Sequence, residues 1–150
     1  MDTTEKENRV IRFQVLGDPI ALKRHRHFKT KTGNIVNVDP NSDDKLSFAD
    51  AVQRHAPKEV PTCPVKMSMT FAFTRPKSHF GTGRNEGKLK GSAPQYHTKR
   101  PDLDNLVKFV KDSLNGIFWK DDSQVVAFGQ VIKYYGVKQA LTTVEIEYIE

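Results

Sequence analysis

Two pairs of acidic residues, separated by a stretch with helical periodicity, constrain this chain more than any other feature. Asp102 and Asp104 stand at the start of the stretch, and Asp121 and Asp122 follow it. Carboxylates that lie close together repel one another unless a cation sits between them. Carboxylate ligands without His or Cys favour Mg²⁺, with Mn²⁺ as the alternative, over Zn²⁺. The two pairs therefore predict a divalent-metal site.

Between the acidic pairs, apolar residues recur at the spacing of one helix face. This spacing predicts a helix over residues 103–115, with Asp102 as its N-cap residue and Gly116 just after its end. A helix of this length rises roughly 18 Å, so the following loop must double back along it if all four acids are to meet. The spacing permits such a loop without requiring it. A capping Asp at one end and a solvated turn at the other are the alternative interpretations.

The remaining elements predict a small α+β fold. Alternation with a period of two predicts strands over four stretches, residues 10–15, 65–73, 125–134 and 141–149. Capping residues predict a second helix over residues 43–55, and a turn around Gly136 predicts that the last two strands form a hairpin. We therefore expect a mixed β-sheet of four to five strands flanked by two helices, in a single domain over residues 1–150.

The charge of the chain points to a polyanionic partner. It has 24 Lys and Arg against 18 Asp and Glu, a net charge of +6. Nucleic acid is favoured over an ordinary solvated surface as the reason for this excess. A basic run over residues 23–29 predicts contacts to DNA phosphates. Residues 77–100 contain four glycines and few large apolar side chains, so we expect a mobile basic loop. The candidate DNA-binding residues are Lys23, Arg24, Arg26, Arg75, Lys77, Lys99 and Arg100.

The sequence also bears on the compartment. Cys63 is the single cysteine, which excludes an intrachain disulfide and a zinc site built on several cysteines. Residues 1–8 are polar and mixed in charge, unlike an apolar leader, and no run reaches the roughly 18 apolar residues of a membrane span. We therefore expect a soluble protein of the cytoplasm with no membrane partner.

Three short segments follow one another with fixed spacing around the predicted helix. They are Arg-Pro-Asp-Leu-Asp-Asn-Leu-Val-Lys at residues 100–108, Asp-Ser-Leu-Asn-Gly at residues 112–116, and Trp-Lys-Asp-Asp-Ser-Gln-Val at residues 119–125. This pattern resembles the signature of the RusA family of Holliday junction resolvases. Gly-Asp-Pro-Ile at residues 17–20 and Lys-Arg-His-Arg at residues 23–26 resemble the family's N-terminal turn and basic run.

The resemblance implies a homodimeric, Mg²⁺-dependent endodeoxyribonuclease that resolves four-way DNA junctions in recombination and repair by paired phosphodiester hydrolysis. It would act in the cytoplasm of a bacterial host if a phage or prophage encodes it. The implied metal ligands on each subunit are Asp102, Asp104 and Asp122, with Asp121 as a supporting acid. Lys108 would stabilise charge in the transition state. Two alternatives stay open, namely a nuclease for other branched DNA and a catalytically silent DNA-binding module of the same fold.

Lys108 also has a simpler interpretation. It lies four residues after Asp104, and residues at this spacing are neighbours on one helix face. An ion pair between the two side chains would satisfy this spacing without any role in catalysis.

Overall fold

A computed structural model describes residues 8–150, and the polar start of the chain, residues 1–7, lies outside the described residues. The strands are β1 (Arg9–Leu16), β2 (Arg26–Lys29), β3 (Ile35–Val38), β4 (Val65–Phe73), β5 (Val125–Tyr135) and β6 (Leu141–Tyr148). The helices are α1 (Ser42–Val52) and α2 (Leu103–Leu114), and single 3₁₀ turns form η1 (Gln53–His55), η2 (Lys77–His79), η3 (Gly83–Asn85) and η4 (Asp122–Gln124). Both predicted helices are confirmed.

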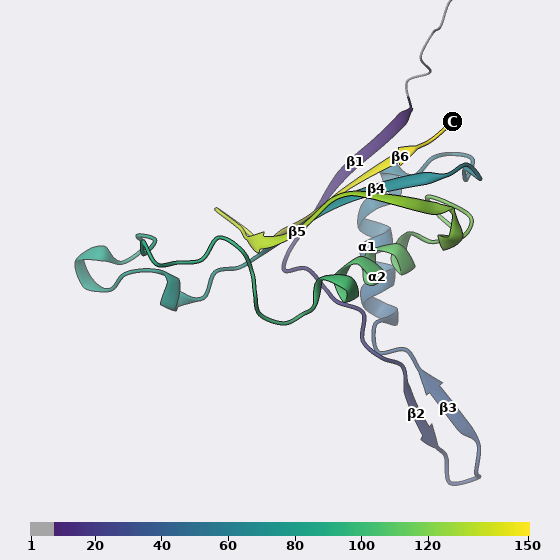
Figure 1. Ribbon diagram of the computed structural model, residues 1–150. Helices are drawn as coiled ribbons and strands as arrows, with labels where there is room; N and C mark the ends of the chain where they lie inside the picture. Colours follow the sequence, from purple (N-terminus) through teal and green to yellow (C-terminus); the bar gives the residue numbers. More distant parts are fainter. Residues whose placement is uncertain (1–7) are drawn as a thin grey trace, which may run out of the picture.

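Four of the strands form one mixed sheet in the order β1-β6-β4-β5. β4 and β5 are parallel neighbours, and α2 provides the crossover between them. The pairs β1–β6 and β4–β6 are antiparallel. β2 and β3 form a separate two-stranded ribbon that extends away from the sheet (Figure 1). The predicted α+β class, with a small mixed sheet and two helices, is therefore confirmed.

The predicted hairpin between β5 and β6 is wrong, because β6 inserts between β1 and β4 instead of pairing with β5. Burial explains the order. In β6, Val144 and Ile146 are fully buried, as suits a strand with neighbours on both sides. In β5, Val126 and Phe128 are 62% and 51% exposed, as suits an edge strand. Alternation in sequence identifies the faces of a strand but not its neighbours.

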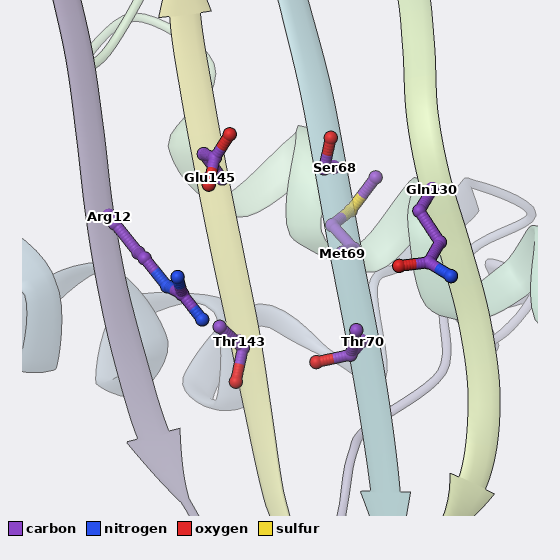
Figure 2. A pocket seen from close by; sticks show the side chains of 7 residues that line it. All are labelled: Arg12, Ser68, Met69, Thr70, Gln130, Thr143 and Glu145. Atoms are coloured by element: carbon purple, nitrogen blue, oxygen red, sulfur yellow. The ribbon is translucent and has the colours of Figure 1, made fainter.

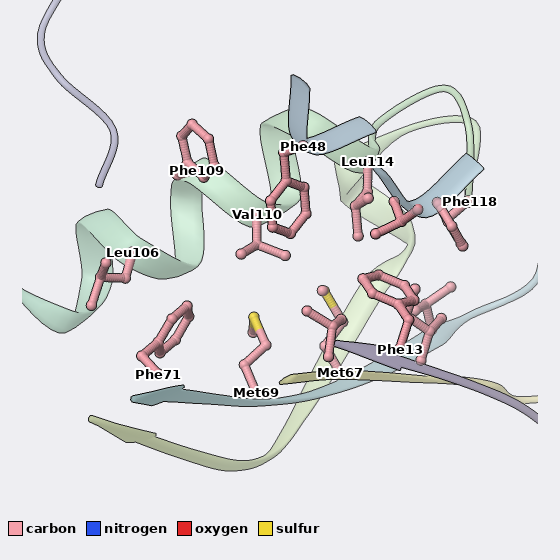
Figure 3. Packing of buried hydrophobic residues seen from close by; sticks show 14 of the residues in the cluster. Phe13, Phe48, Met67, Met69, Phe71, Leu106, Phe109, Val110, Leu114 and Phe118 are labelled. Carbon is pink, nitrogen blue, oxygen red and sulfur yellow. The ribbon is translucent and has the colours of Figure 1, made fainter. Parts of the chain in front are cut away.

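The core lies between the sheet and the two helices, which cover the same face of the sheet (Figure 1). In Figure 3 the apolar face of α2 points towards β4, and both contribute fully or almost fully buried side chains: Leu106, Phe109, Val110 and Leu114 from α2, and Met67, Met69 and Phe71 from β4. Burial of each large apolar side chain contributes roughly 1.5–3 kcal/mol relative to exposure. This packing fixes α2 and leaves its polar ends at the surface.

The opposite face of the sheet is polar, and within residues 8–150 no helix covers it (Figure 1). It has a shallow hollow of about 280 Å³, lined by Arg12, Ser68, Met69, Thr70, Gln130, Thr143 and Glu145 (Figure 2). None of the acidic motif residues lines this hollow, so the candidate site lies elsewhere. In the described part of the chain, neither helix has the length and hydropathy needed to cross a membrane.

Candidate active site

Asp102 and Asp104 lie together at the N-terminal end of α2. Asp102 is the N-cap residue, and its backbone carbonyl accepts a hydrogen bond from the amide of Leu106 at 3.3 Å. Its side chain, however, makes no capping hydrogen bond. Both residues are exposed, and among residues 8–150 neither carboxylate takes part in an ion pair. Two carboxylates are thus free to bind a cation.

A groove of about 860 Å³ opens beside Asp102, and we call it the Asp102 groove. One wall is the segment of residues 19–23, and the other is the start of α2 with the residues that precede it. Lys23 and Arg100 line the groove together with Asp102. Cationic side chains next to a carboxylate suit a phosphate group that meets a metal ion there.

Asn41, which immediately precedes α1, holds one wall of this groove. It is fully buried, and its side-chain oxygen accepts a hydrogen bond from the amide of Lys23. Its side-chain nitrogen donates to the carbonyl of Ala21 at 3.4 Å. The amide of Leu22 donates to the carbonyl of Asn105 in α2 at 2.9 Å. The segment is therefore attached to both helices. Nothing in the spacing of the sequence signals this role.

Most of the predicted DNA-binding residues are exposed, namely Lys23, Arg24, Arg26, Lys77, Lys99 and Arg100, and of these Lys23 and Arg100 line the groove. Arg26 begins the protruding β2–β3 ribbon (Figure 1). Arg75 differs, because it is half-buried and donates a hydrogen bond to the carbonyl of Pro94 at 2.8 Å. Its guanidinium lies 5.1 Å from the ring centre of Tyr135. Arg75 therefore anchors the long loop.

The loop of residues 77–100 extends away from the sheet and contains η2 and η3 (Figure 1). Its last part returns to the edge of β5, where the amide of His97 donates to the carbonyl of Lys133 at 3.2 Å. The amide of Tyr135 donates to the carbonyl of Gln95 at 3.0 Å. His97 is buried and stacks on Phe73 at 4.0 Å between ring centres. The mobility of the rest of the loop stays a prediction.

The second acidic pair lies beyond the C-terminal end of α2, and both of its side chains are engaged. Asp121 caps η4, accepting hydrogen bonds from the hydroxyl of Ser123 and, at 3.0 Å, from its amide. These bonds hold the pKa of Asp121 below its usual value. Asp122 accepts a hydrogen bond from the indole nitrogen of Trp119 at 2.9 Å. Trp119 and Phe118 are fully buried, so they anchor this loop in the core.

The structure brings together the members of each pair but not the two pairs. The 12 residues of α2 separate them, which is roughly 18 Å of helix. β5 begins directly after η4, so the connection does not return along the helix. Within residues 8–150, no three Asp, Glu, His or Cys side chains gather as a metal site. The carboxylate oxygens suit Mg²⁺, but one chain alone does not assemble enough of them.

Lys108 is exposed on α2, one turn after Asp104. The two side chains form no ion pair in the described part of the chain. The simpler interpretation of this lysine therefore has no support from the geometry. Its ammonium group stays available to a ligand held near Asp104.

Comparison with known proteins gives consistent matches. The family model described as endodeoxyribonuclease RusA matches residues 17–147. YqaN of Bacillus subtilis strain 168, an uncharacterized protein, is 36% identical over 127 residues, which is 83% of this chain and 87% of YqaN. The crossover junction endodeoxyribonuclease RusA of Lactococcus phage r1t is 28% identical over 109 residues, 71% of this chain and 74% of the phage protein. The family match spans both ends of α2.

Proposed function

This chain belongs to the RusA family of endodeoxyribonucleases, and on that basis we propose that it is a Mg²⁺-dependent endonuclease that resolves four-way DNA junctions. The single observation that carries the proposal is the pair of unengaged carboxylates at the start of α2, of which Asp102 lines a groove together with Lys23 and Arg100, and Asp104 lies two residues further along the helix. The junction as substrate is supported by the name of the phage relative. The reaction would take place in the cytoplasm of a bacterial host.

Each residue has a stated role in this proposal. Asp102, Asp104 and Asp122 would hold the metal, which when bound supplies an activated water and neutralises the scissile phosphate. Lys108 would donate to the phosphate oxygen on which charge develops. Lys23 and Arg100 in the groove, with the ribbon and loop cations beyond it, would bind neighbouring phosphates and hold the strand in place. Asp121 would support this arrangement by keeping η4 folded.

The separation of the acidic pairs leads to a specific form of the proposed homodimer. Because α2 keeps Asp122 away from the Asp102 groove of its own chain, the partner subunit's Asp122 would complete the metal site there. A two-fold axis would then produce two equivalent sites, which matches the symmetry of a four-way junction and the need for two nicks. This arrangement departs from the sequence-based expectation of one complete site within each subunit.

Mixing two inactive variants tests the shared site. Asp104→Asn and Asp122→Asn proteins should each fail to cleave a labelled four-way junction. After mixing and subunit exchange, the heterodimer should nick one strand, since one of its sites has both wild-type carboxylates and the other has neither. A mixture of Asp102→Asn with Asp104→Asn is the matched control, because these residues share one end of α2 and no heterodimer regains a complete site. If the first mixture is as inactive as the control, the site is not shared between subunits.

The substrate is tested with the wild-type protein. A four-way junction should be cut symmetrically with Mg²⁺ and left intact with EDTA, while a matched linear duplex should stay uncut. Equal cleavage of forked or flapped DNA would favour the broader branched-DNA nuclease. Binding of junctions without cleavage under any metal condition would favour the catalytically silent module.

A further inference from the structure

Lys133 of β5 contacts the chain just before Asp102 in an unusual way. Its ammonium group donates one hydrogen bond to the carbonyl of Lys99 and another to the carbonyl of Pro101, both at 2.7 Å. Its own backbone carbonyl accepts the hydrogen bond from the amide of His97. One residue thus ties down the chain at three points over residues 97–101, which directly precede Asp102.

This contact matters because of what lies on either side of it. Downstream of Asp102, α2 is fixed by its packing in the core. Upstream lies the loop of residues 77–100, which extends away from the sheet (Figure 1). Lys133 stands between the two and fixes the chain where the loop joins Asp102. Asp102 is therefore held from both directions, although its own side chain makes no capping hydrogen bond.

The partly buried ammonium group of Lys133 has a free-energy cost that a purely structural contact would not require. The residue is half-buried, and within residues 8–150 no carboxylate lies within ion-pair distance of its ammonium group. Partial burial of a charge without an opposite charge is unfavourable, and two carbonyl oxygens compensate it only in part. The two hydrogen bonds fix the position of the backbone at Lys99 and Pro101.

We propose that Lys133 is a positioning residue that holds the backbone before Asp102 so that this carboxylate points into the Asp102 groove before DNA or metal binds. The inference rests on the proposed function, since it assigns Asp102 to a metal site. Groups that orient a metal ligand typically change metal affinity by about ten- to a hundredfold when they are replaced. Lys133 acts on Asp102 through the backbone and touches no reacting atom in this account.

The test compares Lys133→Met, Lys133→Arg and wild-type protein in Mn²⁺ binding, measured by electron paramagnetic resonance without DNA. Lys133→Met should bind Mn²⁺ about tenfold more weakly or worse, and Lys133→Arg, which keeps several donors, should recover most of the affinity. Junction binding in EDTA should be unchanged in both, and cleavage by Lys133→Met should be restored by raised Mg²⁺. Lys66→Met is the control, because Lys66 lies on β4 and is not among the residues that hydrogen-bond to residues 97–101, and it should bind Mn²⁺ like wild type.

The outcomes separate this inference from the proposed function. Wild-type Mn²⁺ affinity in a folded Lys133→Met protein overturns the positioning role, whatever the protein cleaves. Weaker Mn²⁺ binding by Lys133→Met, together with no junction cleavage by the wild type, supports the positioning role and overturns the proposed function. If Lys133→Met does not fold, Lys133→Gln replaces it, since its shorter side chain lacks the reach to bridge both carbonyls. The same loss of Mn²⁺ affinity supports the inference, and wild-type affinity overturns it.

Discussion

At the N-terminal end of α2, Asp102 and Asp104 leave their carboxylates unengaged, whereas beyond its C-terminal end Asp121 and Asp122 accept hydrogen bonds from Ser123 and Trp119. The residue type is the same at both ends. The difference is whether the carboxylate oxygens already accept hydrogen bonds from other groups of the protein. Acids that accept hydrogen bonds from nearby backbone or from a buried indole stabilise the fold. Acids without such hydrogen bonds stay available for a ligand.

Asp122 stands between these two cases. A carboxylate has room for about four hydrogen bonds or metal contacts, and the indole of Trp119 occupies one of them. The remaining positions of Asp122 are free to bind a cation, while the tryptophan fixes the orientation of the side chain. A metal ligand oriented by a neighbouring donor is a common arrangement. Asp121, by contrast, is committed to the backbone of η4.

The largest expected effect comes from the unengaged end. Asp102→Asn or Asp104→Asn should reduce the junction-cleavage rate by about a hundredfold or more, because the lost metal charge stabilisation amounts to several kcal/mol. Junction binding in EDTA should stay the same or become tighter, since a negative charge near DNA phosphates is removed. Single-turnover cleavage and a gel-shift titration measure the two quantities. Equal losses of binding and cleavage would count against metal ligation.

The second prediction distinguishes Asp122 from Asp121 by their expected effects on cleavage. Asp122→Asn should lose cleavage nearly as completely as Asp104→Asn, and it should stay folded because the amide oxygen still accepts the bond from Trp119. Asp121→Asn should keep partial activity, because the residue supports η4 and does not ligate the metal in our proposal. Cleavage rates at saturating Mg²⁺, with circular dichroism as the folding check, compare the two. A reversed ranking would mean that Asp121 is the ligand.

Periodicity predicted α2 and all four strands of the main sheet, because it reports which faces are apolar, and capping residues predicted α1. It did not predict that β6 inserts between β1 and β4, since strand order depends on contacts between distant segments. The ribbon of β2 and β3 was also missed. Its β2 strand is wholly exposed, so it has no buried face to produce a pattern. For the site, the sequence identified the acidic pairs, but their separation depends on where the chain goes after α2.

The contacts of Lys133 and Asn41 show a second limit of prediction from the sequence. Lys133 falls between Val131 and Tyr135 on the core-facing side of β5, and this lysine at an otherwise apolar position was a signal that could have been noticed. Its two carbonyl partners, however, lie 32 and 34 residues earlier in the chain. No local pattern contains that information.

A third, smaller effect tests whether DNA binds near the Asp102 end of α2. If the Asp102 end binds DNA, replacing Arg24 and Arg26 together by Ala should weaken binding to junction and duplex alike. The dependence of log K on log salt should become less steep by about 0.9 for each lost phosphate contact. Lys58→Ala, an exposed lysine outside the predicted DNA-binding set, is the control and should leave the slope unchanged. An unchanged slope in the double variant would assign these arginines to an ordinary solvated surface.

The smallest expected effect concerns the stability that Asp121 gives to η4. Hydrogen bonds from Ser123 lower the pKa of Asp121 from its ordinary value of 3.8, so the ionised form is favoured in the folded state. The resulting stability is fully present above the unfolded pKa and is lost as the pH falls through the folded pKa. Asp121→Asn should therefore have a lower Tm than wild type near neutral pH, and the difference should shrink below about pH 4. Ser123→Ala should show part of the same pH-dependent loss, because it removes the hydroxyl donor but keeps the amide. A Tm difference that does not change with pH would show that Asp121 acts through its shape instead of its charge, and the contrast between the two ends of α2 would then rest on the unengaged pair alone.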